Sequence, residues 1–109
     1  MGLAFTRDLP ILCDILLELS EKSSDRLVDE DEIFIYLQEL YKQGKLKSYY
    51  KGPVWPRNGI PNPYLAERDL RYCQLVGVIK PEGIKYRVYP ERVRELKEFA
   101  ERAIKESDI

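Results

Sequence analysis

Histidine is absent from this chain, and cysteine occurs only twice, at Cys13 and Cys73. Without imidazole the chain lacks the commonest general base, and two isolated thiols do not complete a tetrahedral zinc shell. The phosphate-loop, dinucleotide-binding and serine-hydrolase motifs are missing as well. These absences favour a protein that is not an enzyme and holds no metal or other cofactor. We expect both thiols to be buried and reduced, with a disulfide as the alternative.

Long apolar runs are also missing, so the sequence predicts no membrane-spanning helix. The first ten residues, MGLAFTRDLP, lack the basic and then apolar layout of a secretion signal. We therefore expect a cytoplasmic protein. With 109 residues, 44% of them hydrophobic and 34% charged, the chain has the composition of one globular domain. Its high Glu, Lys, Tyr and Ile content and few amides are typical of a thermophile.

Charge is distributed unevenly, although the net charge is only −1. Residues 25–41 contain six acids and one arginine, so their charge is 1 − 6 = −5. Residues 42–57 contain five basic residues and no acid, which gives +5. A local basic block favours one surface that binds phosphate. The alternative is that the two blocks face each other or solvent.

Apolar residues at helical spacing predict a first helix over residues 9–22, preceded by Asp8 as its N-cap. A second helix is predicted over residues 30–43, after Asp29 as the first residue of a capping box. Gly44 is expected to end it in a left-handed conformation. The first helix is apolar around most of its surface, so we expect it to lie centrally.

The second half of the chain predicts a helix, a hairpin and a last helix. Asn62 is suited to cap the third helix, and Gly77 follows its last periodic residue. A two-stranded hairpin then leads to a fourth helix over residues 90–105. Upstream, the short stretch RLV before Asp29 is predicted to be an extended bridge.

The third helix has two different faces on a helical wheel. Ala66, Leu70 and Cys73 form an apolar face. One tyrosine and two arginines lie on the opposite side: Tyr64, Arg68 and Arg71. Arginine bonds bidentately to guanine or phosphate, so this face suits a DNA major groove. The alternative is an ordinary solvated face, with Glu67 and Asp69 neutralising the arginines.

Residues 45–61 form a long connection with three prolines, which excludes a regular helix. Cations and aromatic residues alternate there: Lys45, Lys47, Tyr49, Tyr50, Lys51, Trp55 and Arg57. Cations bind a phosphate backbone and aromatic rings stack on exposed bases, so this loop is a candidate nucleic-acid-binding element. The alternative is that the aromatic rings cover the core while the lysines stay solvated.

The hairpin turns at Pro81 and Gly83. Alternation predicts that Ile84, Tyr86 and Val88 point to the core. Three basic residues are expected on or beside its outer side: Lys80, Lys85 and Arg87.

The last helix has a narrow apolar seam on a charged background: Val93, Leu96, Phe99, Ala100 and Ala103. Such a seam predicts a homodimer, because two-fold dimers are common among proteins that read palindromic DNA. The alternative is packing on the first helix of the same domain.

Residues 62–90 resemble the winged helix–turn–helix superfamily, and the stretch LRYCQLVGVIKPEGIKYRVYP at 70–90 has its pattern of helix end, glycine, turn and strand. The resemblance implies a mainly helical α+β fold over the whole chain, with a core at 8–89 and an extra C-terminal helix at 90–106. It also implies that the third helix is the recognition helix and the hairpin a wing. The last helix looks like the dimerisation helix of small prokaryotic or archaeal regulators. The long 45–61 loop departs from the family pattern.

The function expected from these features is duplex DNA binding by a transcriptional regulator that forms a homodimer. One alternative is a protein-interaction module, because fold alone does not set function. Another is an RNA-binding protein that stacks single-stranded bases on Tyr49, Tyr50 and Trp55.

Overall fold

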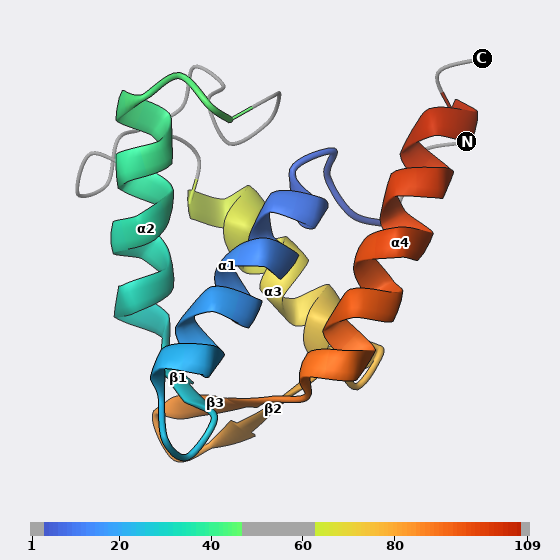
Figure 1. The fold of residues 1–109 in the computed structure, drawn as a ribbon. Coiled ribbons are helices and arrows are strands. Elements are labelled where there is room, and N and C mark those ends of the chain that lie inside the picture. The colour runs from blue at the N-terminus through green and yellow to red at the C-terminus, as the bar shows by residue number, and fades with distance from the viewer. Residues whose placement is uncertain (1–3, 47–62, 108–109) are drawn as a thin grey trace.

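The computed structural model describes residues 4–46 and 63–107 of the chain (Figure 1). Within these ranges the elements follow in the order α1, β1, α2, α3, β2, β3, α4. Their bounds are Leu9–Lys22, Leu27–Asp29, Glu30–Lys42, Pro63–Leu75, Ile79–Glu82, Lys85–Val88 and Pro90–Ser107. None of the described helices is both long enough and apolar enough to cross a bilayer. The predicted class, mainly helical with a small antiparallel sheet, is confirmed.

Helix α1 forms the centre of the core. Its apolar side chains cover more than one face, and Leu9, Leu12 and Leu16 are completely buried. The helix lies between α2 and α4 in Figure 1, and its most extensive packing is against α4. The central position predicted from its wide apolar face is therefore confirmed.

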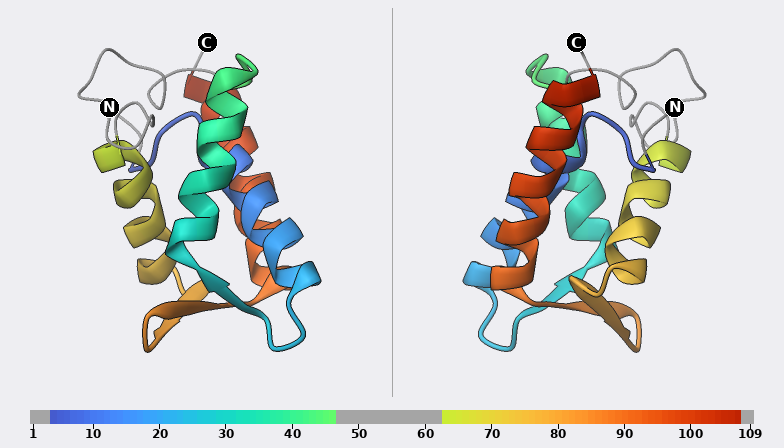
Figure 2. Two further views of the ribbon diagram at one scale, coloured as in Figure 1. Left: turned by 90° about the vertical axis from the view of Figure 1, so that its left-hand side faces the viewer. Right: turned by 90° about the vertical axis from the view of Figure 1, so that its right-hand side faces the viewer.

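The three described strands form one antiparallel sheet in the order β1-β3-β2. Val28 of β1 lies opposite Tyr86 of β3, and Ile79 of β2 lies opposite Val88 of β3. The sheet closes one end of the helical assembly (Figure 2). Val28, Ile79 and Val88 are buried, so this face packs on the helices and supports a hairpin that would be marginal alone. The predicted extended bridge is thus an edge strand.

Helices α2 and α3 are both followed by a glycine in the left-handed conformation, as predicted for Gly44. The φ angles are 70° at Gly44 and 81° at Gly77. After α3, the Gly77 N–H donates to the carbonyl of Gln74 (3.1 Å), and the Val78 N–H donates to that of Cys73 (3.0 Å). This Schellman arrangement satisfies carbonyls that a helix end leaves unpaired. It also sends the chain directly from α3 into β2.

The helix N-termini agree only in part with the predicted caps. Asp29 caps α2, because its carboxylate accepts a hydrogen bond from the Asp31 N–H at 3.0 Å. Asp8 precedes α1, but its side chain makes no capping hydrogen bond to that helix.

The prediction that Ile84 points to the core from the hairpin is wrong. Its side chain is 85% exposed, because the residue lies in the turn between β2 and β3 and not in a strand. The alternation begins after the turn, where Tyr86 is half-buried and Val88 is buried.

Helix α4 packs along α1 of the same chain. Val93, Leu96 and Ala100 are buried there, with at most 7% of their surface exposed. The prediction that these three residues form a dimer seam is therefore wrong. They pack on the first helix of the same chain, which was the alternative. Phe99 keeps 48% of its surface exposed, and Ala103 is partly buried.

A buried pair of hydrogen bonds joins the segment before α1 to α3. Thr6 donates its backbone N–H to Asp69 Oδ1 (2.9 Å) and its hydroxyl to Asp69 Oδ2 (2.6 Å). Both side chains are buried. Asp69 is thus on the core side of α3, where it is bonded to Thr6. A buried carboxylate is costly unless bonded, so this pair supports the docking of α3.

We expect Asp69→Ala to lower the free energy of unfolding by about 2–3 kcal/mol, because it leaves both Thr6 donors unpaired in the core. Urea denaturation followed by circular dichroism measures this loss. Glu67→Ala removes the same charge from a half-buried position on the same helix and is the matched control. Equal losses in the two variants would contradict the role of the buried pair.

Candidate nucleic-acid interface

Helix α3 separates a buried face from an exposed face, as its sequence predicts. Ala66, Leu70 and Cys73 are buried with at most 2% exposure. On the other side Arg68 and Arg71 are exposed, and Tyr64 is 65% exposed. The three side chains predicted to reach a nucleic acid therefore share one accessible face of α3.

Leu75 belongs to the same exposed face and was missed by the sequence analysis. It stands four residues after Arg71, so it continues the row of Tyr64, Arg68 and Arg71 at helical spacing. Its side chain is 79% exposed. The signal that could have found it is its place on the helical wheel.

A surface pocket of about 410 Å³ lies where α3, β2 and the start of α4 meet. Arg71 of α3 and Lys80 of β2 both line it, so the structure brings together two of the predicted binding residues. The wall also contains Gln74, Tyr89 and Arg92. No carboxylate is among the described residues that line the pocket. The charged side chains in its lining are therefore all cations.

Arg92 is the cation that sequence analysis did not identify. Its Nη1 donates a hydrogen bond to the Gly77 carbonyl at 3.0 Å, and its guanidinium lies 4.6 Å from the centre of the Tyr89 ring. These contacts join the start of α4 to the end of α3. In the sequence Arg92 is one of several charged residues on the last helix, and nothing there distinguishes it.

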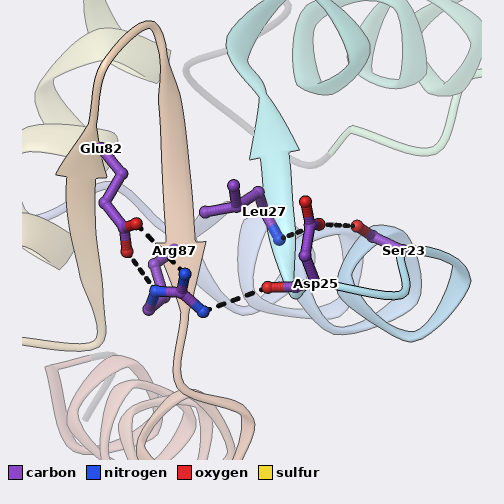
Figure 3. Close-up of polar contacts among 5 residues, drawn as sticks. All are labelled: Ser23, Asp25, Leu27, Glu82 and Arg87. Atoms are coloured by element: carbon purple, nitrogen blue, oxygen red, sulfur yellow. Dashed lines mark hydrogen bonds and ion pairs between the residues drawn. The ribbon is translucent and has the colours of Figure 1, made fainter.

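Arg87 is engaged within the sheet. Its guanidinium binds the Glu82 carboxylate through two nitrogens, and Nη1 donates to the Asp25 carbonyl at 3.1 Å (Figure 3). The hydrogen bond from Arg87 lowers the pKa of Glu82, and the same bond raises the pKa of Arg87. Arg87 was predicted to bind nucleic acid from the wing. In the structure its partners are instead Glu82 and the Asp25 carbonyl, and the second contact joins the hairpin to the chain before β1.

The same contact region holds the turn that leads into β1. Asp25 Oδ1 accepts hydrogen bonds from the Ser23 hydroxyl (2.5 Å) and the Leu27 N–H (3.1 Å) (Figure 3). These bonds lower the pKa of the Asp25 carboxyl, with the Ser23 hydroxyl as the larger cause. The turn therefore presents the Asp25 carbonyl to Arg87 in a defined position.

The remaining predicted cations are dispersed. Lys85 is half-buried in β3 opposite Asp29 of β1. Lys45 is exposed just after α2, whose C-terminal end points away from the sheet (Figure 1). The structure therefore does not bring Lys45 together with Lys80. Six predicted loop residues lie outside the described residues: Lys47, Tyr49, Tyr50, Lys51, Trp55 and Arg57.

Comparisons of the chain with protein-family models, curated proteins and solved structures found no match.

Cys13 of α1 and Cys73 of α3 are free thiols that are completely buried, as expected. Burial raises the pKa of Cys13 from an ordinary value of 9.0 to about 12, and it raises the pKa of Cys73 as well. Only the thiolate is a nucleophile or a metal ligand, so these thiols behave as apolar core groups. Over the described ranges no three thiol or carboxylate side chains gather as metal ligands.

Both thiols should resist a thiol-specific reagent in the folded protein, even at pH 9.0, where an ordinary thiol is half ionised. The folded pKa lies above the unfolded one, so the stability associated with the neutral thiols is complete below pH 9.0 and is lost as the pH rises toward 12. Labelling with and without urea measures this protection. Rapid labelling of either cysteine in the absence of urea would show that the burial is wrong.

Proposed function

We propose that the chain is a duplex-DNA-binding protein of winged-helix type that acts as a cytoplasmic transcriptional regulator. In this proposal α3 is the recognition helix and the β2–β3 hairpin is the wing. The observation that carries it is that Arg71 of α3 and Lys80 of β2 line one pocket beside an exposed cationic helix face. The order of helices and strands, with β1 paired to the hairpin, also supports it.

The exposed face of α3 has the chemistry that a major groove requires. The groove is about 12 Å wide and admits one helix. Arg68 can bond bidentately to a guanine, and Tyr64 can bond to phosphate or sugar oxygens. Leu75 offers an apolar contact for a thymine methyl group. Because the opposite face of α3 is buried, the helix can enter a groove without exposing the core.

The affinity of the chain for random duplex DNA should fall steeply as salt rises, because each phosphate contact displaces condensed cations. The expected slope of log K against log salt is about −0.9 for each phosphate contact. Fluorescence anisotropy between about 50 and 200 mM salt measures it. No binding at the lowest salt, or an affinity that is independent of salt, would refute the proposal and favour a protein-interaction module. Tighter binding to single-stranded RNA would instead favour the RNA-binding alternative.

We expect Arg68→Ala to reduce the preference for a selected DNA sequence over random DNA by about tenfold, because each bidentate base contact contributes about 1–3 kcal/mol of discrimination. A binding selection on random duplexes supplies the preferred sequence. Arg94→Ala is the control, because Arg94 is an exposed arginine on α4, where it lies near Glu21. Equal effects of the two variants would mean that Arg68 reads no base.

A homodimer is part of this proposal, and its surface is revised by the structure. Phe99 is the large apolar residue of the predicted seam that stays half-exposed, at 48%. If α4 pairs two copies, Phe99→Glu should convert the dimer to a monomer in sedimentation equilibrium, because the charge would be desolvated at the contact. Arg102→Glu on the exposed side of α4 is the control. A monomeric wild-type protein would contradict the homodimer.

A further inference from the structure

We infer that the pocket between α3, β2 and the start of α4 is a phosphate-binding site, in which Arg71, Lys80 and Arg92 hold one phosphate group. The inference rests on the proposed function to the extent that bound DNA supplies this phosphate from its backbone. A free phosphorylated molecule would present the same chemistry. The site adds Arg92 of α4 to the proposed interface, which otherwise consists of the recognition helix α3 and the β2–β3 wing.

Three cations from three separate elements converge on this pocket. Arg71 comes from the last turns of α3, Lys80 from β2 and Arg92 from the first turn of α4. A phosphate offers oxygens in several directions, so it can accept bidentate bonds from guanidinium groups and also lie near an ammonium charge. A carboxylate has only two oxygens in one plane and would leave part of this cation set unpaired. The donor set therefore favours phosphate.

Arg92 is held in position before any ligand binds. The Gly77 carbonyl accepts a hydrogen bond from Nη1, and the Tyr89 ring lies under the guanidinium. A guanidinium has five N–H donors, so this arrangement leaves others for an anion. A side chain that is already ordered loses less conformational freedom on binding, and this lowers the cost of the contact.

Acidic residues on the same elements have other partners or lie outside the pocket. Glu82, two positions after Lys80 on β2, binds Arg87. Burial raises the pKa of Glu30 in α2, and the charge of Glu67 raises it further, so Glu67 of α3 lies toward α2. Glu91, next to Arg92, is exposed and does not line the pocket. Besides joining the hairpin to the chain before β1, Arg87 therefore neutralises Glu82, which lies beside the cations of the pocket.

The remaining wall is suited to the group that adjoins a phosphate. Leu75, Ile79 and Pro81 provide apolar surface, and Gln74 provides an amide. At about 410 Å³ the pocket exceeds the volume of one phosphate, so it has room for an attached sugar. Phosphate contacts set the register of a protein on DNA. A phosphate held here would fix α3 and the hairpin relative to the same backbone position.

The first experiment tests the pocket without DNA. Inorganic phosphate is titrated into the ¹⁵N-labelled protein at constant ionic strength, and NMR follows the amides of Gly77 and Lys80 and the Nε of Arg92. Saturable shifts of these three signals are expected. Arg92→Gln should abolish the shifts at Gly77 and Lys80, and Arg94→Gln, which removes the same charge two residues away, should retain them.

The second experiment measures duplex DNA affinity at about 0.1 M salt. Arg92→Gln is expected to weaken binding about tenfold and to reduce the salt slope by about one unit, whereas Arg94→Gln should stay within about twofold of wild type. Lys80→Gln should reproduce the loss while keeping the Gly77–Arg92 hydrogen bond intact. It therefore separates a lost phosphate contact from a local loss of structure, which circular dichroism checks in each variant.

The two experiments separate failure of the site from failure of the proposed function. In one outcome the protein binds phosphate, Arg92→Gln abolishes that binding, and the protein binds no DNA. This result would refute DNA binding and support the pocket as a site for a free phosphorylated molecule. DNA binding that Arg92→Gln and Arg94→Gln weaken equally, without phosphate-dependent NMR shifts, would overturn the phosphate site and leave DNA binding standing.

Discussion

The left-handed turn at Gly77 sets the positions of three elements at once. Its backbone bonds end α3, the same turn directs the chain into β2, and its carbonyl receives the Arg92 guanidinium from α4. At a φ of 81° a residue with a Cβ atom would be strained, so this geometry depends on glycine. Arg71 and Lys80 line the same pocket as Arg92 because the chain turns sharply between α3 and β2.

Burial of α1 explains why α4 belongs to the same core. A helix that is apolar on several sides needs more than one neighbour, and α2 alone covers only part of its surface. Val93 and Ala100 cover another part, and the ion pair between Lys97 and Asp14 at 2.7 Å lies along the same contact. The start of α4 is thereby held at a defined place, which is a condition for Arg92 to reach Gly77.

Local signals in the sequence predicted the helices well, because helix ends are decided by nearby residues. The apolar spacing of α1 and the glycines after α2 and α3 are local features, and the helix bounds agree with them. Contacts between distant residues left no such signal. Thr6 and Asp69 are 63 positions apart, and the pairing of Arg87 with the Asp25 carbonyl spans 62. Tertiary contacts of this kind decided which predicted cations remain available for a ligand.

A chain with a net charge of −1 can attract a polyanion only if its cations are gathered and its acids are paired or placed elsewhere. The structure has both features around α3. Asp69 is bonded inside the core, and Glu82 is bound by Arg87, so two acids that are close in sequence to the cationic residues contribute less repulsion. Arg71, Lys80 and Arg92 then share a wall without carboxylates among the described residues. For the proposed interface, the pairing of these acids matters as much as the number of cations.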